Sequence, residues 1–519
     1  MRIEKSKLKD ANSFSAIFLD YINQKESLRE FYEQFPLVEN FENQIKTRNF
    51  PAANRIVLAE VLEKQYADVE KSDAVIKNIS SLKEEKTFTI TTGHQLNIFS
   101  GPLYFIYKIV TVINTCKELK KAYPNYNFVP VYWMASEDHD FEEINHFYLF
   151  SKKYTWETEQ RGAVGRFSPA AIKETMEVLP EKIALFEKAY SAHESLADAT
   201  RYFVNELFGA EGLVTVEADD AKLKSLFREV VKDDLLKNTA KKLVEESSKE
   251  LVNQGYKAQV NPREINFFYL DNQLRERIVL EGNSYHVNNT ALKFSEAALL
   301  ELLEKSPEKF SPNVIMRPLY QEVILPNLAY VGGPGEIAYW LQLKDMFVHY
   351  AIPFPILMPR NFAMVINKAT AKKINKLNIN TYDLFSPFLD MKTKFLHDNA
   401  DSELNLSDEL KEIAQVFEAI KSKAGAVDKG MEGFVGAESS KVFKSIKNIE
   451  KRLKKSEESK QEVAIKSLEG IKDKLFPGGS PQERHDNFMN FYLNNPDFIN
   501  ELLEKFEPFD FNYNILIDE

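Results

Sequence analysis

Strand-like and helix-like hydrophobic patterns alternate along the first part of the chain. A β-branched apolar run at 87–92 ends at Gly93, a helical pattern follows from Pro102 to about Ala122, and another apolar run covers 129–135. Proline fits the first turn of a helix, and a strand, a helix and a strand at this spacing predict a βαβ unit with a right-handed crossover. The pattern therefore predicts an α/β fold built on a parallel sheet.

The same alternation continues with two interruptions. Residues 151–205 read as a helical insertion, and residues 255–287 contain the pattern of a small β-rich insertion. Between them, 213–220 predicts a buried strand that ends in carboxylates and leads into a helix reaching about Glu250.

The remaining core elements are expected after the second insertion. The sheet is predicted to resume at 313–319, followed by a glycine-rich turn at 331–336 and a helix through Leu343. A last strand is predicted at 355–360.

The pattern changes to long helices after about residue 400. Apolar residues then step by four and three positions, which is the seam of a coiled coil. The first helix carries Leu406, Leu410, Ile413, Phe417 and Ile420, and the second carries Val442, Ile446, Ile449 and Leu453. The four glycines within 424–437 predict a hairpin loop, and the second helix is expected from about Ser439 to Leu475. These features predict an antiparallel helical arm.

Together the patterns divide the chain into seven segments. They are the first half of the core (1–150), a helical insertion (151–205), more of the core (206–254), a β-rich insertion (255–310), the second half of the core (311–400), the coiled-coil arm (401–476) and a tail packing on the core (477–519).

Composition narrows the class of protein. The 519 residues are 44% hydrophobic with a net charge of -11, which suits a globular protein and not a nucleic-acid-binding one. The single cysteine, Cys116, lies on the apolar side of a predicted helix and is expected to be buried and inert. Neither a signal peptide nor an apolar run of membrane-spanning length is seen, so a cytoplasmic location is expected.

The first candidate segment for chemistry is the loop at 93–102, which joins a predicted strand to a predicted helix. Backbone N–H groups at a helix start favour an anion, and its glycines allow close backbone approach. His94 could act as an acid, a base or a phosphate-contacting cation, or it could simply cap a structured loop.

The second candidate segment is the acidic cluster at 136–146, directly after the second strand. Carboxylates at this place are costly to bury unless they are paired or bind a ligand. A divalent metal could use His139, Asp140 and His146, but the spacing matches no established metal motif, and no metal is assigned.

The third candidate segment combines Arg317 with the glycine-rich turn at 332–336. The turn opens a helix but lacks the spacing of known nucleotide-binding loops. Arg317 and Arg360 are suited to clamp a carboxylate or a phosphate, or each could form a surface ion pair. Tyr104 and Lys108, one helical turn apart, could face the cleft or lie in solvent.

The motifs as a set resemble the BshC family, the cysteine ligases of bacillithiol synthesis. The resemblance rests on TGHQ at 92–95 with SGPLY at 100–104, PVYWMASEDHDF at 130–141 with Asn145-His146, and RP at 317–318. It also rests on AYVGGPGEIAY at 329–339, PR at 359–360, and LFP at 475–477 with QER at 482–484. It covers nearly the whole chain.

The resemblance implies a Rossmann-like core related to class I aminoacyl-tRNA synthetases and nucleotidyltransferases. It also implies inserted connecting segments, a coiled-coil arm used for homodimerisation, and the addition of cysteine to the amine of glucosaminyl-malate. Many members of the family have glutamine at the position of His94, which moves the expectation towards the Gly93 backbone and Gln95.

These considerations give a set of expected roles. The candidate catalytic residues are Glu137, Asp138, His139, Asp140, Gln95 and His94. The candidate substrate-binding residues are Gly93, Asn97, Ser100, Gly101, Tyr104, Ser136, His146, Arg317, Gln321 and Arg360, and the candidate nucleotide-binding residues are Gly332, Gly333, Gly335 and Glu336.

The expected reaction is amide formation on an activated cysteine carboxylate. Chemical need makes ATP or another adenine nucleotide the expected energy source, although no motif identifies the cofactor. The expected partners are the two small-molecule substrates and a second copy of the chain, with no nucleic acid and no membrane. Two alternatives remain: an enzyme that activates a different acid, and a scaffold that recruits the true ligase.

Overall fold

A five-stranded parallel sheet forms the centre of the computed structural model, which describes residues 1–400 and 404–518. Its strand order is β13-β12-β2-β3-β6, and every neighbouring pair is parallel. The strands are β13 (Ile356–Pro359), β12 (Asn327–Gly332), β2 (Thr87–His94), β3 (Asn127–Met134) and β6 (Val214–Glu217). All five carboxyl ends therefore meet at one edge of the sheet.

The predicted βαβ unit is confirmed. Helix α5 (Tyr104–Ala122) connects β2 to β3, and its first half is buried almost completely against the sheet and neighbouring helices. Strands β2 and β3 pair along their whole length, from Thr87–Asn127 to His94–Met134. The two sequence clusters that follow these strands consequently lie side by side.

Two insertions flank the central sheet. The first lies between β3 and β6 and contains α6 (Phe141–Ile144), the hairpin β4 (His146–Leu149) and β5 (Lys152–Thr155), and helices α7 (Ile172–Glu177), α8 (Ala184–Ala192) and α9 (Leu196–Phe208).

The core continues after β6 with α10 (Ala221–Ser225), α11 (Arg228–Lys237) and α12 (Thr239–Asn253). The single helix expected up to Glu250 is therefore wrong, because Asn238 adopts a left-handed conformation (φ 53°) between α11 and α12.

The β-rich insertion forms a second sheet of order β10-β9-β8-β7-β11. Its strands are β7 (Phe267–Asp271), β8 (Leu274–Glu281), β9 (Ser284–Val287), β10 (Lys293–Phe294) and β11 (Phe310–Pro312), with α13 (Glu296–Lys305) before the last strand. The chain then re-enters the core.

The strand predicted at 313–319 is wrong, because a helix, α14 (Met316–Ile324), occupies this place. Its buried residues Met316, Leu319, Tyr320 and Ile324 follow helical spacing, and Pro318 falls within the first turn, where no N–H is needed. The sheet resumes with β12 instead, and the short helix α15 (Pro334–Trp340) follows the glycine-rich turn. Helix α16 (Lys344–His349) precedes β13.

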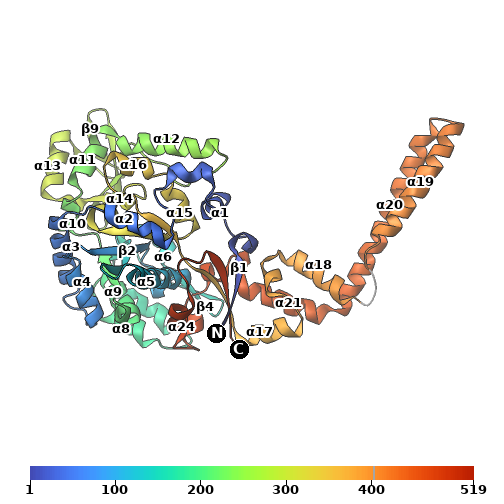
Figure 1. Ribbon diagram of the computed structural model, residues 1–519, viewed down its shortest axis with the longest axis horizontal. Helices are drawn as coiled ribbons and strands as arrows, with labels where there is room; N and C mark the ends of the chain where they lie inside the picture. Colours follow the sequence, from blue (N-terminus) through green and yellow to red (C-terminus); the bar gives the residue numbers. More distant parts are fainter. Residues whose placement is uncertain (401–403, 519) are drawn as a thin grey trace.

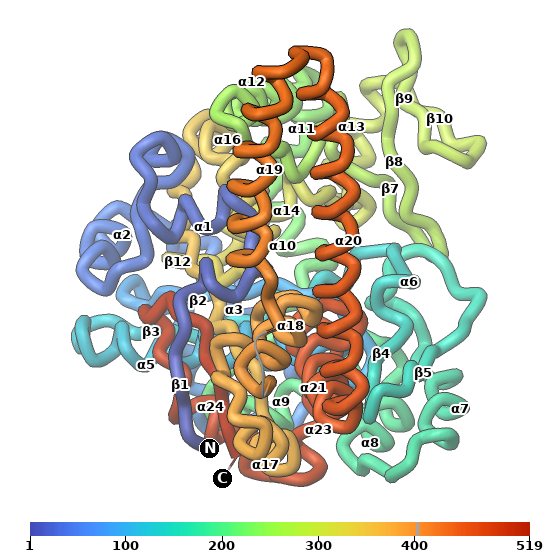
Figure 2. The backbone as a smooth tube through the Cα atoms, turned by 90° about the vertical axis from the view of Figure 1, so that its right-hand side faces the viewer, coloured from blue at the N-terminus to red at the C-terminus, as the bar shows by residue number. Residues whose placement is uncertain are grey.

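The arm projects far from the body (Figure 1), and its two helices run antiparallel beside each other (Figure 2). Helix α19 (Ser407–Val427) and helix α20 (Met431–Lys460) are joined by only three residues, 428–430. The hairpin loop predicted at 424–437 is therefore too long. Gly425 lies inside α19 and faces the Glu432 side chain of α20.

The second long helix is not continuous. It breaks at Gln461, and α21 (Glu462–Leu475) leads back to the body beside α17 (Lys368–Lys376) and α18 (Phe388–Asn399). The Pro477-Gly478-Gly479 turn follows α21 as expected. Within the described residues, no helix combines the length and apolar character that a membrane span requires.

The two ends of the described chain meet in a small three-stranded sheet of order β1-β15-β14 (Figure 1). Strand β1 (Arg2–Lys7) pairs with β15 (Asn512–Ile517), which also pairs with β14 (Phe362–Ile366). Helices α22 (Gln482–His485), α23 (Met489–Tyr492) and α24 (Phe498–Lys505) lie between the arm and β15. A buried ion pair from Glu483 to Arg360 (2.6 Å) ties this tail to the end of β13.

We expect Glu483→Gln to lower the free energy of unfolding by about 3–5 kcal/mol, because it leaves the buried Arg360 guanidinium without its counter-charge. Urea denaturation followed by circular dichroism measures this change. Glu504→Gln, at an exposed glutamate of α24, is the matched control and should leave the midpoint nearly unchanged. Equal midpoints for Glu483→Gln and the wild type would contradict the prediction.

Candidate active site

A cavity of about 630 Å³ opens at the carboxyl edge of the central sheet, where open α/β sheets bind their ligands. Its walls come from the ends of β2, β3 and β12, from the turn before α15 and from the β-rich insertion. The sequence-predicted residues that line it are Gly93, His94, Gln95, Tyr104, Glu137, Asp138, Arg317, Gly333, Gly335, Glu336 and Arg360.

Lys108 forms the floor of the cavity. It reaches from α5 under the end of β2, where its ammonium group donates to the Gly93 carbonyl (2.7 Å) and pairs with Glu336 (2.6 Å). Burial lowers the pKa of Lys108, while the Glu336 carboxylate opposes that shift. Lys108 thus links the end of β2 at Gly93 to the glycine-rich turn at 332–336, and its side chain faces the cleft.

Glu336 occupies the start of α15 itself. Its carboxylate accepts hydrogen bonds from the Gly333 N–H (2.9 Å) and from the Tyr330 hydroxyl (2.6 Å). Burial raises its pKa, but the ion pair with Lys108 outweighs burial and holds that pKa below the usual value. The glycine turn is therefore capped by its own glutamate, which occupies the Gly333 N–H. Gly333 and Gly335 line the cavity, whereas Gly332 does not.

The acidic side of the cavity centres on Gln95. Its amide nitrogen donates to Asp138 (2.7 Å) and to Glu143 (2.6 Å), so two carboxylates converge on one side chain. The other Asp138 oxygen accepts the backbone N–H of His139 (2.7 Å) and shapes the turn after β3. Asp138 and Glu143 are partly exposed to the cavity and provide its negative charge.

Glu137 belongs to a chain of charged side chains behind this side, of which Lys224 and Asp219 are buried deepest. It pairs with Lys224 (2.5 Å), which also pairs with Asp219 (3.1 Å), and Asp219 pairs in turn with Arg166 (2.8 Å). Although burial lowers the pKa of Lys224, its two carboxylate partners raise it above the ordinary value. The network connects the ends of β3 and β6 and fixes the Glu137 side chain.

The β-rich insertion closes one wall through Arg275 of β8. Its guanidinium lies 4.0 Å from the Phe268 ring centroid, contacts the Ser311 hydroxyl (3.0 Å) and reaches His139 Nδ1 (2.6 Å). Burial and the neighbouring Arg275 charge lower the pKa of His139. His139 is thus a neutral partner of the insertion and does not line the cavity.

Two arginines differ in how their charge is balanced. Arg360 is buried and binds both oxygens of Glu483 (2.6 and 3.0 Å). Arg317 donates only to neutral groups, the Tyr339 hydroxyl (2.9 Å) and Gln321 (3.2 Å), and has no carboxylate within ion-pair distance among the described residues. Arg317 is therefore the better candidate to bind an anion.

His94 is packed between rings. It stacks on Phe105 at a centroid distance of 5.1 Å and meets the Tyr104 ring edge-on at 5.3 Å. Burial, together with the nearby charge of Lys108, lowers its pKa to about 3. The imidazole is neutral near pH 7, so it cannot serve as the phosphate-contacting cation that the sequence allowed.

Several predicted residues lie outside the cavity and have structural contacts instead. Asn97 donates to the Glu143 carbonyl (2.9 Å), and its side chain fills the space where a Cβ on Gly101 would clash (2.5 Å). Gly101 has a φ of 63°, so this loop needs glycine for its backbone conformation. Ser100 is buried in the same loop, also with a positive φ.

The remaining predictions outside the cavity follow the same pattern. Ser136 is buried against Gly165, Gln321 orients Arg317, and His146 contacts the Asn145 side chain (3.0 Å). Asp140 is exposed beyond the cavity rim. Across residues 1–400 and 404–518, no three His, Cys, Asp or Glu side chains gather as a metal would require, so His139, Asp140 and His146 do not form the considered site.

The sequence reasoning missed several residues of the site. Glu143 lies in the acidic cluster at 136–146, but its hydrogen bond with Gln95 depends on how the loops after β2 and β3 fold. Lys224 and Arg275 come from later segments and have no local motif. Arg484 lines the cavity from the tail. Its QER motif at 482–484 supports the family resemblance but predicts no role in the site.

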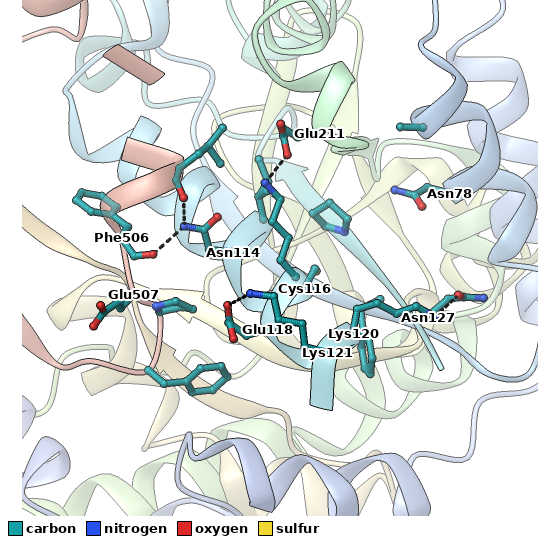
Figure 3. Close-up of a pocket in the computed structure, with 18 of the residues that line it drawn as sticks. Asn78, Asn114, Cys116, Glu118, Lys120, Lys121, Asn127, Glu211, Phe506 and Glu507 are labelled. Carbon is teal, nitrogen blue, oxygen red and sulfur yellow. Dashed lines mark hydrogen bonds and ion pairs between the residues drawn. The ribbon is translucent and has the colours of Figure 1, made fainter. Parts of the chain in front are cut away.

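A larger cavity of about 1110 Å³ lies at the opposite end of β3, near its first residues (Figure 3). Two of its lysines are paired with acids, Lys117 with Glu211 (2.6 Å) and Lys121 with Glu118 (2.7 Å). Cys116 is buried at its edge, and burial raises the pKa of this thiol well above its usual value, as expected for an inert cysteine. None of the predicted site residues lines this cavity.

The comparison with family models covers both halves of the chain. Residues 1–361 match the model described as "Bacillithiol biosynthesis BshC, N-terminal Rossmann-like domain", and residues 363–517 match the corresponding "C-terminal coiled-coil domain". The chain belongs to the BshC family. The Rossmann-like core and the coiled coil predicted from the sequence are thereby confirmed.

Relatives are similar over nearly their whole length. A protein of Flavobacterium psychrophilum is 46% identical, with 97% of each chain covered, and one of Cytophaga hutchinsonii is 42% identical, with 98% of each covered. Both are named "Putative cysteine ligase BshC". A solved Campylobacter jejuni structure titled "putative arginyl t-RNA synthetase" matches over 87% of this chain and 93% of its own at 10% identity, but its TM-score of 0.23 does not establish a shared fold.

We expect the imidazole C–H resonance of His94 not to shift between pH 5 and 8, because its pKa of about 3 leaves it neutral throughout. Proton NMR measures this, with His94→Gln identifying the signal. Since the unfolded chain protonates first, the wild type should also lose more stability than His94→Gln as the pH falls from 6.5 towards 3. A titration midpoint near 6.5 in the folded protein would contradict the assignment.

Proposed function

We propose that this chain joins the carboxyl group of cysteine to the amine of glucosaminyl-malate, forming bacillithiol. The names of its relatives and its membership in the BshC family support a cysteine ligase. The observation that carries the proposal is the division of charge in the cavity. Asp138 and Glu143 converge on Gln95 at one side, while the unpaired Arg317 guanidinium lies at another.

The acidic side suits the amine. An ammonium group is attracted by the Asp138 and Glu143 carboxylates, and Gln95 keeps both oriented through hydrogen bonds of 2.7 and 2.6 Å. The amine must lose a proton before it attacks a carboxyl carbon, and a carboxylate within hydrogen-bond reach can accept it. We assign this role to Asp138 or Glu143.

The basic side suits an anion. Arg317 has fixed hydrogen bonds to Tyr339 and Gln321, so its guanidinium is already oriented before a ligand arrives. The Gly333 N–H is engaged by Glu336, which moves the proposed phosphate or carboxylate contact from the glycine turn to Arg317. The nucleotide roles expected for Gly332, Gly333, Gly335 and Glu336 become structural ones in this proposal.

The reaction needs an energy source, because an amide does not form from a free carboxylate in water without activation. We propose ATP as the co-substrate that activates the cysteine carboxylate. A cysteine carboxylate oxygen would form a bond to a phosphorus of ATP while a P–O bond of ATP breaks and ADP or pyrophosphate leaves. The amine nitrogen then forms the C–N bond, the C–O bond to the phosphate or AMP group breaks with its electrons leaving on that oxygen, and the nitrogen releases one proton. The cavity would accelerate this step mainly by holding both reactants together.

The direct test supplies purified protein with cysteine, glucosaminyl-malate and ATP. Bacillithiol and a stoichiometric amount of ADP or AMP are expected, measured by mass spectrometry and nucleotide chromatography. Product without ATP consumption would remove the activation step. Activity with another acid in place of cysteine would indicate a different acid-activating enzyme.

Asp138→Asn is expected to lower the rate of bacillithiol formation by roughly 100-fold or more, because a neutral amide can neither attract the ammonium group nor accept its proton. Asp140→Asn is the matched control, since Asp140 follows on the same loop but is exposed and does not line the cavity. Circular dichroism checks that both variants fold. A scaffold would give the same product yield with either variant.

We also propose that the arm pairs two copies of the chain. No residue of α19 is buried, and apolar side chains remain exposed on both helices, with Val416 56%, Phe434 62% and Ile449 51% exposed. A two-helix arm buries little apolar surface alone, and packing against a second arm would cover these side chains.

Phe434→Glu combined with Ile449→Glu is expected to convert a dimer into a monomer, because each charge would be buried in the proposed interface. Size-exclusion chromatography with light scattering measures the mass. Lys447→Glu, an exposed change on the same helix, is the control and should leave the mass unchanged. A monomeric wild type at micromolar concentration would contradict the proposal.

A further inference from the structure

The segment at 482–490 returns the chain from the arm to the body, and it reaches the candidate active site. It contains α22 and the residues up to Asn490. Its Arg484 lies in the coiled-coil family domain and lines the 630 Å³ cavity together with Arg317 and Arg360. The segment at 482–490 is called the post-arm segment below.

The first half of the post-arm segment is fastened to the core by buried hydrogen bonds. Gln482 accepts the Val365 N–H (2.9 Å) and donates to the carbonyl of the same residue (3.2 Å). Glu483 binds Arg360 through both oxygens and also accepts the Ala363 N–H (3.1 Å). These contacts fix the backbone directly before Arg484.

The second half is fastened to the loop that follows β2. Asn487, which is fully buried, donates to the carbonyls of Phe99 (2.7 Å) and Gly101 (2.6 Å). The Asp486 carbonyl accepts the Leu103 N–H (2.7 Å) at the start of α5. The post-arm segment is thus bound to the same loop that leads from the cavity to Tyr104.

The Arg484 side chain itself stays exposed and has no carboxylate within ion-pair distance in the described part of the chain. Its guanidinium lies 5.9 Å from the centroid of the Tyr104 ring, which Arg360 also approaches at 5.2 Å. Arg360 is neutralised by Glu483, whereas Arg484 and Arg317 are not. A rigid backbone that presents an unpaired guanidinium to a cavity is suited to bind a planar anion.

We propose that Arg484 is a substrate-contacting residue and that, with Arg317, it binds an anionic group, either a carboxylate or a phosphate. Glu483 and Asn487 act as positioning residues, because they hold the post-arm segment against the core. This proposal rests on the proposed function for the choice of ligands. It makes the coiled-coil domain a contributor to the active site.

Isothermal titration calorimetry with the full chain tests the proposal. The ligands are malate, glucosaminyl-malate, cysteine and ATP with magnesium, titrated separately. Arg484→Gln is expected to weaken one or more of them by about 10- to 100-fold, the loss typical of a charge-assisted hydrogen bond. Arg484→Lys should lose less, and Arg452→Gln, at an exposed arginine of the arm, should lose nothing.

The pattern of losses identifies the anion. Weaker malate and glucosaminyl-malate binding with unchanged ATP binding indicates the malyl carboxylates, weaker cysteine binding indicates the amino-acid carboxylate, and weaker ATP binding indicates a phosphate. Asn487→Ala should weaken the same ligand as Arg484→Gln and leave the others, whereas general damage to the fold would weaken all of them.

The outcomes also separate this proposal from the proposed function. Affinity lost in Arg484→Gln without bacillithiol formation by the wild type would support the anion site and contradict the ligase reaction. Normal bacillithiol formation with unchanged affinities in Arg484→Gln would overturn the role of Arg484 alone. A wild type that binds none of the four ligands would overturn both.

Discussion

The ammonium group of Lys108 lies under the carboxyl edge of the sheet with its side chain only 3% exposed. Removing an ammonium group from water costs several kcal/mol, so the position is stable only while strong partners surround it. The partners are the Gly93 carbonyl of β2 and the Glu336 carboxylate of α15, which are more than 200 residues apart in the chain. The geometry of the cavity floor therefore depends on one buried cation.

Two further charge networks apply the same constraint elsewhere around the cavity. Lys224 of α10 holds Glu137 at the end of β3, and Glu483 of the tail holds Arg360 at the end of β13. In each case one segment supplies the cation and a distant segment supplies the carboxylate. Loss of either partner would leave an uncompensated buried charge, so these pairs specify how insertions and tail sit on the core.

The sequence was sufficient to predict the elements whose hydrophobic pattern is set locally. The βαβ unit of β2, α5 and β3 is an example, because its strands are buried along nearly their full length and its helix is buried over its first three turns. It was insufficient at 313–319, where apolar residues and a proline suit either a strand or a first helical turn. The glycines near 430 led to the prediction of too long a loop. In the structure most of them lie inside helices, because packing of α19 on α20 outweighs their weak helix propensity.

Prediction of the site had a comparable limit. Residues after β2 and β3 were found because parallel strands bring their carboxyl ends together, and Gln95, Glu137 and Asp138 do line one cavity. What a local pattern cannot show is which polar groups are already satisfied by the fold. From the sequence, the Gly333 N–H is a candidate anion contact, but in the structure Glu336 accepts its hydrogen bond. Arg360 is likewise a candidate anion clamp, but Glu483 binds its Nη1 and Nη2 atoms.

Charged groups that are already paired within the fold are not available to a ligand, and this restricts the chemistry of the cavity. Once the internally paired charges are set aside, the Asp138 and Glu143 carboxylates around Gln95 remain on one side of the cavity. On the other side remain the guanidinium groups of Arg317 and Arg484, and that of Arg275, which donates to Ser311, Pro312 and His139. A substrate that carries an amine and an anion on one small frame could satisfy both sides at once, whereas a simple anion or a simple amine would leave one side unpaired. This complementarity agrees with the proposed function, in which the acceptor carries both an amine and acidic groups.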